Sequence, residues 1–449
     1  MLLICMATAG LVAWPTQPSR ASAPGWQVVI PTTPGPGPRG QYGMAADLSG
    51  HIYLYGGNGG LDTALDDFWE YDTVSNRWQA LSNTVVPALI EPHLVIDGQG
   101  NVWEFGGIAD PGAPHLTPDG HSFGLYEYQP ALGAWSDRTP RDAQSGIDWP
   151  PGREDFGFAF DSRTDDLVVF AGEGEGEGML NDLWLYNVRS ANWTSVNQHY
   201  TDPTGVPIAP RELYNISADN HGHFYLFGGT FLAPPNGAGA SGYANDLWRY
   251  DDATQTWTLL AGIANGYDPR MPLPRHYYGQ TVDAAGDFDV LGGYLVDSAN
   301  PPFFSKDVYA RYALPFRFST GPEPGSYGLS DFWRYDPISG WHDAADELGA
   351  LSGSPMIPYM LVLDQTTNRL YTFGGFHLAP NDLLTPSNTL WSLSEDDLIS
   401  PPTPTVTSVP STTPSGTATA RPSASPSRTA GTQPSATPSR TAGARPSLT

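Results

Sequence analysis

Four arginines occupy equivalent positions in the sequence, and together they could form an anion-binding site. Each follows closely on a proline and lies eight residues before an aspartate. The four are Arg39, Arg153, Arg211 and Arg275. Guanidinium groups bind carboxylates and sulfates through two parallel hydrogen bonds, so a converging set could hold an acidic ligand. The alternative, which the acidity of the chain favours, is that each arginine pairs with an acid of a neighbouring repeat, such as Glu154, Asp155 or Glu212.

Two histidines and a glutamate lie near the same positions and could supply acid and base groups. His276 directly follows one of these arginines, Glu154 follows another, and His93 lies near the start of a predicted strand. An imidazole beside a carboxylate can move a proton at neutral pH. Neither histidine belongs to a closely spaced pair of metal ligands, so the sequence predicts no metal site and no cofactor. The acidic run that begins at Glu173 lacks the spacing of a calcium loop, and we expect a solvated loop there.

Residues 301–318 read PPFFSKDVYARYALPFRF and are rich in aromatic and basic side chains. Aromatic residues and arginine are enriched at the points of protein interfaces that supply most of the binding energy. We therefore expect this segment to contact a partner. The predicted contact residues are Phe303, Phe304, Tyr309, Arg311 and Tyr312. The alternative is a structural flap that folds over its own repeat.

The composition of the chain excludes several classes of function. The formal net charge is −26, from 47 acidic against 21 basic residues. A nucleic-acid partner needs a basic footprint that this chain lacks, and anionic membranes are disfavoured for the same reason. The sole cysteine, Cys5, lies in an apolar run too short to span a bilayer. Residues 1–23 are predicted to be a signal peptide, which leaves the mature chain without a thiol for a disulfide, a nucleophile or a metal.

One unit, repeated six times, supplies the elements that position these residues. In each unit an aspartate is followed, ten or eleven residues later, by the second member of a pair of small residues. The pairs are Gly56-Gly57, Gly106-Gly107, Ala171-Gly172, Gly228-Gly229, Gly292-Gly293 and Gly374-Gly375. The stretch before each pair, for example IYLYGG or FYLFGG, is typical of a β-strand. The unit therefore predicts a hairpin whose polar turn begins at the aspartate and whose second strand ends at the glycines.

A third strand follows in each unit after a variable loop, and a tryptophan marks a fourth strand in the first five units. These tryptophans are Trp78, Trp135, Trp193, Trp257 and Trp341. The sixth unit lacks one, whereas Trp26 stands unmatched before the first unit. An open array would expose a strand edge at each end, so we expect the N-terminal strand to complete the sixth unit. The predicted fold is all-β, a six-bladed propeller with a closed ring.

The glycine pair and the downstream Tyr…Trp pair resemble the kelch repeat, and the resemblance extends over residues 25–395. It implies a propeller of the superfamily that includes the central domain of galactose oxidase. Galactose-oxidase-like copper chemistry needs a tyrosine cross-linked to a cysteine, which the mature chain lacks. An enzyme similar to sialic-acid mutarotase, which is also similar to kelch propellers, needs only acid, base and carboxylate-binding groups. Glu154, His276 and the four arginines could supply them.

Strand direction predicts the side on which a ligand binds. The glycine-pair loops and the connections between units lie on one side, here called face one, and short hairpin turns lie on the other, face two. The loops that vary in length all belong to face one, and the longest lies between Gly293 and Trp333. Variable loops on one side of a propeller usually form its binding surface, so we expect binding on face one.

The predicted organisation is a signal peptide at residues 1–23, a kelch-type propeller at 24–397 and a disordered Pro/Ser/Thr-rich tail at 398–449. We expect a secreted protein, or one tethered to a surface through this tail. The predicted function is a monomeric module that binds a protein or carbohydrate and is not an enzyme. The alternative function is an extracellular carbohydrate-active isomerase that resembles sialic-acid mutarotase.

Overall fold

The computed structural model describes most of the first 400 residues, with gaps. The described residues are 25–60, 63–110, 112–176, 178–200, 208–212, 215–231, 242–262, 270–296, 326–344, 356–357, 360–378 and 384–398. The chain divides into two compact units, Met1–Ser400 and Pro401–Thr449. All described residues belong to the first unit, so the predicted signal peptide and tail lie outside them.

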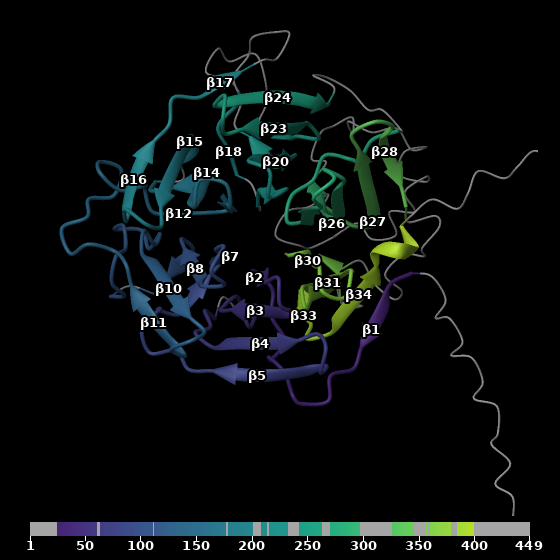
Figure 1. Ribbon diagram of the computed structural model, residues 1–449, viewed down its shortest axis with the longest axis horizontal. Helices are drawn as coiled ribbons and strands as arrows, with labels where there is room; N and C mark the ends of the chain where they lie inside the picture. The colour runs from purple at the N-terminus through teal and green to yellow at the C-terminus, as the bar shows by residue number, and fades with distance from the viewer. Residues whose placement is uncertain are drawn as a thin grey trace, which may run out of the picture. The chain divides into compact units, whose positions relative to one another are not determined.

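Six antiparallel sheets, here called blades 1 to 6, stand around a central axis, each with four main strands in order from the axis outward (Figure 1). Blades 1 to 3 are β2 (Gly43–Ala46), β3 (His51–Tyr55), β4 (Phe68–Asp72), β5 (Arg77–Leu81); β7 (His93–Ile96), β8 (Val102–Phe105), β10 (Leu125–Gln129), β11 (Ala134–Asp137); and β13 (Gly157–Asp161), β14 (Asp166–Gly174), β15 (Gly178–Asn187), β16 (Asn192–Ser195). Blades 4 to 6 are β19 (Ser217–Ala218), β20 (His223–Phe227), β23 (Leu247–Asp251), β24 (Thr256–Ala261); β25 (Gly279–Val282), β26 (Phe288–Val296), β27 (Ser326–Asp336), β28 (Gly340–Asp343); and β30 (Val362–Asp364), β31 (Arg369–Phe373), β34 (Leu390–Ser394), β1 (Gln27–Val29). The predicted all-β, six-bladed propeller is confirmed.

The N-terminal strand closes the ring, as the unmatched tryptophan predicts. Strand β1 pairs antiparallel with β34, and the register sets Gln27 opposite Ser392. Trp26 directly precedes this ladder, and Leu393 directly follows Ser392, so the two residues lie at the end of the strand pair where the other blades have their Tyr…Trp pair. The Trp26 ring packs edge-on against Phe332 of blade 5 with centroids 5.9 Å apart. Closure therefore joins the first and last strands of the propeller through both hydrogen bonds and aromatic packing.

The repeated tryptophans pack between blades. Each contacts the aromatic residue that precedes the small-residue pair of the preceding blade, with ring centroids 4.8–6.0 Å apart. The contacts are Trp78–Phe373, Trp135–Tyr55, Trp193–Phe105, Trp257–Phe170 and Trp341–Phe227. The second glycine of each pair allows the backbones to approach: a Cβ on Gly57 would lie 2.6 Å from the Gly40 carbonyl oxygen. These contacts thus explain why the small-residue pair and the tryptophan recur in each of the first five blades.

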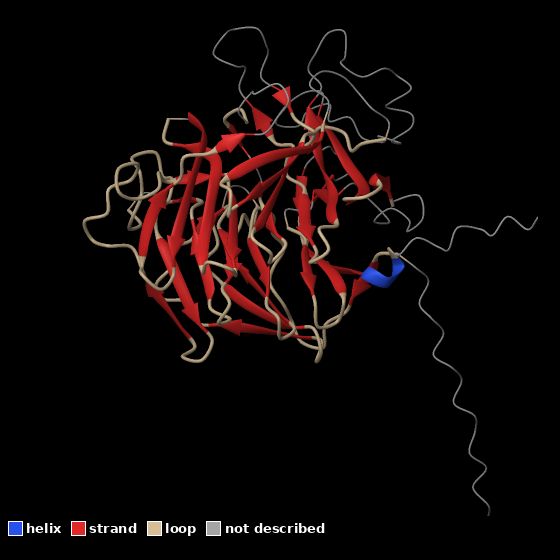
Figure 2. Cartoon of the chain, turned by 45° about the horizontal axis from the view of Figure 1, so that its top comes forward, coloured by secondary structure: helices blue, strands red, loops and turns tan. Residues whose placement is uncertain are grey.

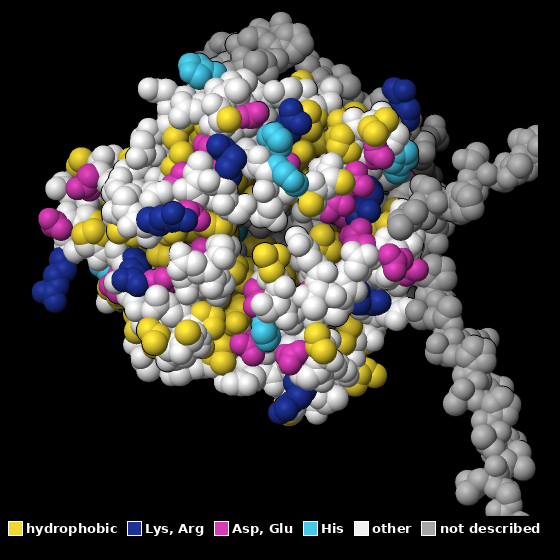
Figure 3. Space-filling model, in the orientation of Figure 1, with side chains coloured by type: hydrophobic (Ala, Val, Ile, Leu, Met, Phe, Trp, Pro, Cys, Tyr) yellow, Lys and Arg dark blue, Asp and Glu magenta, His cyan; other side chains and the backbone are white. Residues whose placement is uncertain are grey.

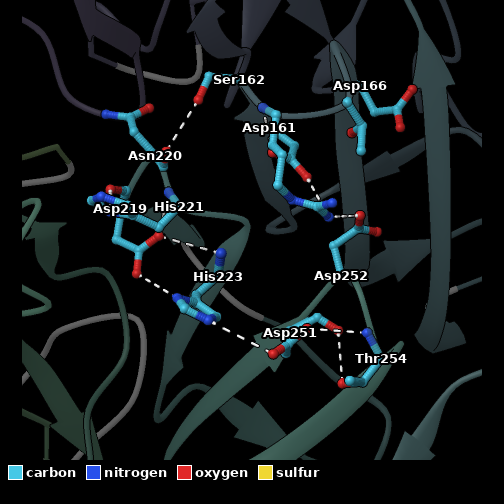
Figure 4. A network of polar contacts seen from close by, with 12 residues as sticks. Asp161, Ser162, Asp166, Asp219, Asn220, His221, His223, Asp251, Asp252 and Thr254 are labelled. Atoms are coloured by element: carbon cyan, nitrogen blue, oxygen red, sulfur yellow. Dashed lines mark hydrogen bonds and ion pairs between the residues drawn. The ribbon is translucent and has the colours of Figure 1, made fainter.

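Face two consists of short hairpin turns in which aspartates accept backbone hydrogen bonds. Asp219 Oδ1 accepts from the N–H groups of His221 and His223 at 2.8 and 3.3 Å. The equivalent aspartates of the other blades make the same turn: Asp47, Asp97, Asp161, Asp283 and Asp364. Figure 4 shows two of these turns, where Ser162 of blade 3 also donates to the Asn220 carbonyl of blade 4. The repeated aspartate therefore stabilises the first hairpin of each blade, as predicted.

Face one carries additional short strands above the blades. They are β6 (Leu89–Ile90) with β9 (Ile108–Ala109); β12 (Arg153–Glu154); β18 (Arg211–Glu212) with β21 (Thr230–Phe231) and β22 (Gly242–Tyr243); and β29 (Met356–Ile357) with β32 (Phe376–Leu378) and β33 (Leu384–Pro386). Strand β17 (His199–Tyr200) runs parallel to β24 at the rim. Strands dominate the cartoon in Figure 2, and the described helix is the single turn η1 (Glu395–Asp397). Within the described residues, no helix has the length and apolar character needed to cross a membrane.

Candidate functional site

Arg275 shows how the four repeated arginines are used. Its Nη1 and Nη2 atoms donate to the two carboxylate oxygens of Asp331, each at 2.7 Å. Nη1 also donates to the Gly292 carbonyl at 2.8 Å, and Nε donates to the Leu273 carbonyl at 3.0 Å. The Arg275 side chain is fully buried. This arginine therefore ties the third strand of blade 5, its glycine pair and the connection from blade 4 into one unit.

The same arrangement, here called the arginine strut, recurs in blades 1, 3 and 4. The other three ion pairs are Arg39–Asp67, Arg153–Asp182 and Arg211–Asp246. In all four blades the tryptophan two residues after the aspartate donates its indole N–H to the same carboxylate, at 2.7–2.8 Å. Burial pushes the pKa of Asp67 and Asp182 upward, but the paired guanidinium outweighs burial and lowers each pKa. The prediction that Glu154, Asp155 or Glu212 of a neighbouring repeat would be the partner is therefore wrong.

Blades 2 and 6 lack both charged members of the strut. Blade 2 has Leu89 and Gly124 at the arginine and aspartate positions, and blade 6 has Met356 and Thr389. Blade 6 keeps the tryptophan, but Trp391 Nε1 has no hydrogen-bond partner among the described residues. Because the arginine and the aspartate occur only together, the sequence did contain a signal for their pairing. The prediction missed this signal because other acids lie directly next to the arginines in the sequence.

The backbone turns sharply at the position two residues after the arginine. Four described residues at this position have a left-handed backbone, with φ between 48° and 59°. They are Gln41, Glu91, Asp155 and Tyr277. Each precedes the innermost strand of its blade, β2, β7, β13 or β25. Left-handed backbone is unfavourable for residues other than glycine, and it is often retained where a side chain must be aimed at a functional site. The four residues therefore occupy equivalent positions in their repeats.

These residues meet at the axis on face one, in a group here called the mouth cluster: Gln41, Glu91, Glu154, Asp155, Glu212, His276 and Tyr277. His276 Nε2 lies 3.5 Å from Asp155 Oδ2 and 3.7 Å from Glu212 Oε2. The Tyr277 hydroxyl donates to Asp155 Oδ2 at 3.3 Å. Asp155 belongs to blade 3 and His276 and Tyr277 to blade 5, so the contacts of Asp155 join blades that are not adjacent, whereas the contact between His276 and Glu212 joins the adjacent blades 4 and 5. One carboxylate oxygen of Asp155, one of Glu212 and one imidazole nitrogen of His276 all lie within 4.8 Å of one another.

The mouth cluster holds more negative charge than its surroundings neutralise. Burial raises the pKa of Asp155 well above its usual value, and nearby Glu154 and Glu212 raise it further. Burial and Asp155 likewise raise the pKa of Glu91. Burial raises the pKa of Glu212 to about 7, although His276 opposes the shift. Carboxylates crowded in this way need a proton or a cation at neutral pH.

A second histidine, His121, lies next to Glu154. His121 Nε2 lies 3.5 Å from Glu154 Oε1, and His121 Nδ1 lies 2.9 Å from Asp119 Oδ1. Burial lowers the pKa of His121, but the two carboxylates outweigh burial and raise it to about 9. His121 is therefore protonated at neutral pH and bridges two acids through opposite sides of its ring.

The sequence-predicted site residues have different locations. His276 lies in the mouth cluster, as predicted, whereas His93 is buried with its ring 4.4 Å from that of Phe156. The guanidinium groups of the four arginines are engaged in struts, and the ligand-binding role suggested for them stays an untested prediction. The predicted contact residues of the long loop lie outside the described residues: Phe303, Phe304, Tyr309, Arg311 and Tyr312. The sequence prediction missed Gln41, Glu91 and Tyr277 as members of the mouth cluster.

Six blades, a closed ring and the repeated strut define a β-propeller. Comparison with known families identifies its repeats. The KLHDC2/KLHL20/DRC7 Kelch-repeats domain matches residues 115–309, and the Kelch motif matches residues 48–84. The chain therefore belongs to the kelch-repeat family, as the glycine and Tyr…Trp pairs indicated.

Three relatives each match part of the chain, and one of them is a kelch-domain protein by name. The chain is 28% identical over 210 residues to Kelch domain-containing protein 10 of Xenopus laevis, which is 45% of this chain and 44% of that relative. It is 25% identical over 285 residues to human Host cell factor 2, or 60% of this chain and 32% of the relative. Multiple epidermal growth factor-like domains protein 8 of Mus musculus is 26% identical over 234 residues, 51% of this chain and 7% of the relative. The chain thus spans less than half the length of each of these relatives.

Proposed function

We propose that this protein is an exported protein-interaction module that binds basic side chains of a partner at the face-one mouth. The observation that supports this proposal is the excess of carboxylates over cations in the mouth cluster. Its outer acid, Glu154, has a side chain 18% exposed and lies within reach of a docked partner. A partner that supplies lysine or arginine there would relieve the repulsion between these carboxylates.

Two further features support a basic partner. The net charge of −26 steers cationic ligands toward the protein over a distance of about a Debye length, roughly 8 Å at physiological ionic strength. Figure 3 shows the same scarcity of basic groups: on the face that it draws, the few Lys and Arg side chains are scattered rather than gathered into a patch, in keeping with the acidic composition. Similarity to kelch proteins supports the broader assignment as an interaction module.

Export is the second part of the proposal. It depends on the predicted signal peptide at residues 1–23, the single cysteine within it and the Pro/Ser/Thr-rich tail. We expect secreted material to begin after residue 23 and to contain no titratable thiol. Intact-mass measurement of protein from the culture medium tests this, and a secreted species that retains residues 1–23 would contradict the proposed cleavage.

The enzymatic alternative gains little from the geometry. It required Glu154 and His276 to act together on a sugar, but Glu154 contacts His121, whereas His276 contacts Asp155 and Glu212. An acid–base pair must lie within hydrogen-bond reach of the same substrate atoms. The isomerase hypothesis therefore stays a prediction, and interconversion of sugar anomers by the purified protein would be its direct test.

The proposed partner site can be tested with a random peptide library displayed on phage and selected against the full chain. We expect enriched peptides to be rich in lysine or arginine and to bind more weakly in high salt. Glu154→Gln should weaken their binding. Asp72→Asn is a matched control, because this half-buried face-two carboxylate accepts from the N–H groups of Val74 and Ser75, as an amide oxygen also can.

Either of two results would overturn the proposed site. One is enrichment of acidic or uncharged peptides, which would show that the mouth charge does not select the partner. The other is equal loss of binding in Glu154→Gln and Asp72→Asn, which would show that only net charge matters. Both variants must first show the melting temperature of the unmodified protein.

A further inference from the structure

We propose that Asp155, Glu212 and His276 bind one divalent transition-metal ion at the centre of the face-one mouth. This inference goes beyond the proposed partner binding and does not depend on it. Asp155 Oδ2 and Glu212 Oε2 both approach the same nitrogen, Nε2 of His276, at 3.5 and 3.7 Å. Ligand atoms around a tetrahedral zinc ion stand about 3.4 Å apart, given metal–ligand distances near 2.1 Å. Two of the three separations are therefore close to those of a metal site, and the third, between a carboxylate oxygen of Asp155 and one of Glu212, is at most 4.8 Å.

His276 differs from two other histidines because both of its neighbouring carboxylates approach the same ring nitrogen. His223 meets Asp219 through Nδ1 and Asp251 through Nε2, at 2.8 and 3.8 Å. His121 likewise meets Asp119 and Glu154 through different nitrogens. Carboxylates on opposite sides of an imidazole cannot chelate one ion together with it. In the described part of the chain, Asp155, Glu212 and His276 form the one group of at least three such residues with the required proximity.

Carboxylate oxygens without donors provide an independent indication of a cation. Asp155 and Glu91 are only 4% and 2% exposed, yet Asp155 Oδ1 and Glu91 Oε2 have no hydrogen-bond donor among the described residues. The two carboxyl groups are close enough to share a hydrogen bond if one of them is protonated. A buried carboxylate without a donor or a counter-ion is costly, so this part of the mouth must take up a proton or a cation.

The arginines do not supply the missing positive charge. Each of the four near the mouth is held by the aspartate of its own strut. The described residues provide no lysine or arginine ion pair to Glu91, Glu154, Asp155 or Glu212. A small cation can enter a space that a long cationic side chain of a partner cannot fill, since Asp155 and His276 side chains are each only 6% exposed. The inner part of the mouth thus suits a metal ion and the outer part suits the partner.

The donor set selects the class of metal. One imidazole nitrogen and two carboxylates are ligands for Zn²⁺, Mn²⁺ and similar transition metals. Ca²⁺ and Mg²⁺ prefer oxygen ligands throughout and serve as selectivity controls. Because the three ligands are contributed by blades 3, 4 and 5, an ion would also cross-link these blades on face one.

Calorimetric titration of the full chain, without a histidine tag and after treatment with EDTA, tests the site. We expect Zn²⁺ or Mn²⁺ to bind with one-to-one stoichiometry, whereas Mg²⁺ and Ca²⁺ should bind far more weakly. Protons held by the crowded carboxylates must leave, so the measured heat should change with the ionisation enthalpy of the buffer. Co²⁺ as a substitute should give the visible absorption of a low-symmetry site with nitrogen and oxygen ligands.

Variants assign the binding to the proposed residues. Asp155→Asn and Glu212→Gln should each weaken metal binding by at least about tenfold, since even the loss of a hydrogen bond to a metal ligand costs about that much. His223→Gln is the matched control on face two and should leave metal affinity unchanged. Glu212 is the more exposed of the two ligands, with 16% of its side chain accessible, so its variant remains informative if Asp155→Asn fails to fold.

The outcome separates this inference from the proposed function. Absence of saturable binding at millimolar Zn²⁺ and Mn²⁺ would overturn the metal site, and so would binding that His223→Gln abolishes or that both mouth variants retain. Basic peptides that bind equally well in EDTA would then leave the partner site standing. Metal binding without any peptide enrichment would support the metal site and contradict the partner site.

Discussion

Two of the groups that place a histidine between two carboxylates differ in how their carboxylate oxygens are satisfied. On face two, Asp219 accepts from two backbone N–H groups of its turn and from His223, whose ring points between Asp219 and Asp251 in Figure 4. At the mouth, Asp155 Oδ1 has no donor among the described residues, and its other oxygen has two long contacts, to Tyr277 at 3.3 Å and to His276 at 3.5 Å.

The difference separates acids that hold the fold from acids that are open to a ligand. A carboxylate whose lone pairs are filled by neighbouring N–H groups stabilises the turn or strand that carries it. A buried carboxylate that lacks such donors destabilises the fold until a proton or a cation arrives. The arginine struts belong to the first kind although they lie on face one, so it is hydrogen bonding rather than position that distinguishes the mouth cluster.

Loss of ring closure should have the largest effect. Deletion of residues 25–30 removes β1 and Trp26, which exposes the edge of β34 and the aromatic face of Phe332. We expect loss of cooperative thermal unfolding together with loss of metal binding, because the mouth depends on all blades converging. Removal of residues 1–24 alone leaves β1 intact and serves as the control. An unchanged melting transition after the longer deletion would contradict closure by β1.

The next largest effect should come from a broken strut. Arg275→Ala removes the guanidinium that donates to both carboxylate oxygens of Asp331. The Asp331 carboxylate then lacks a guanidinium partner, as Asp155 does among the described residues of the mouth cluster. We expect the free energy of unfolding to fall by about 3–5 kcal/mol in urea titration. Arg77→Ala, at an exposed position of β5, should change it by less than about 0.5 kcal/mol. Equal effects of the two substitutions would show that the strut contributes little.

The fold could be predicted from the sequence because its signals are local. The aspartate, glycine and tryptophan of each unit lie within one hairpin or at its flanks, so constant spacing follows directly from strand geometry. Closure was predictable because one unit lacked a tryptophan and Trp26 was unmatched. The partner of each strut arginine was not predicted, because a loop of variable length separates the two residues. Arg275 and Asp331 are 56 residues apart, whereas Glu212 directly follows Arg211 in the sequence.

The mouth could be predicted only in part. His276 and Glu154 were assigned to the mouth because strand direction places the start of every innermost strand there. The contact of Asp155 with His276 was not predictable, because it crosses the axis between blades 3 and 5 and depends on ring diameter and side-chain reach. Asp155 and Tyr277 each lie in a left-handed turn of their own blade. No glycine marks these turns in the sequence, so only the backbone angles reveal that the turn recurs.

A matched pair of aspartate substitutions compares the two faces directly, with a smaller effect. Asp219→Ala removes four hydrogen bonds from a face-two hairpin, and we expect a loss of about 1–3 kcal/mol in the free energy of unfolding. Asp155→Asn keeps a residue that tolerates left-handed backbone and removes a crowded charge, so metal-free stability at pH 7 should be unchanged or higher. Urea titration in EDTA measures both. Marked destabilisation by Asp155→Asn would mean that the mouth acid is structural.

The smallest expected effect is a change in how stability depends on pH. The pKa of Glu212 is raised from 4.5 to about 7, first by burial and then by Glu173 and Glu154. A carboxyl group whose pKa is higher in the folded state contributes its full stability below pH 4.5 and loses it as the pH rises to about 7. Metal-free Glu212→Gln should therefore match the unmodified protein near pH 4 and become the more stable of the two by pH 8.

The difference between variant and unmodified protein isolates this group from other buried acids. Burial also raises the pKa of Asp289 to about 7 and that of Glu104 well above its usual value, but both are present in each protein and cancel. Urea titrations in EDTA at several pH values measure the difference. Addition of Zn²⁺ should reverse its sign near pH 8, because the ion neutralises Glu212 in the unmodified protein and binds weakly to the variant. A difference that does not vary with pH would show that Glu212 is already satisfied in the fold, and the contrast with Asp219 would then disappear.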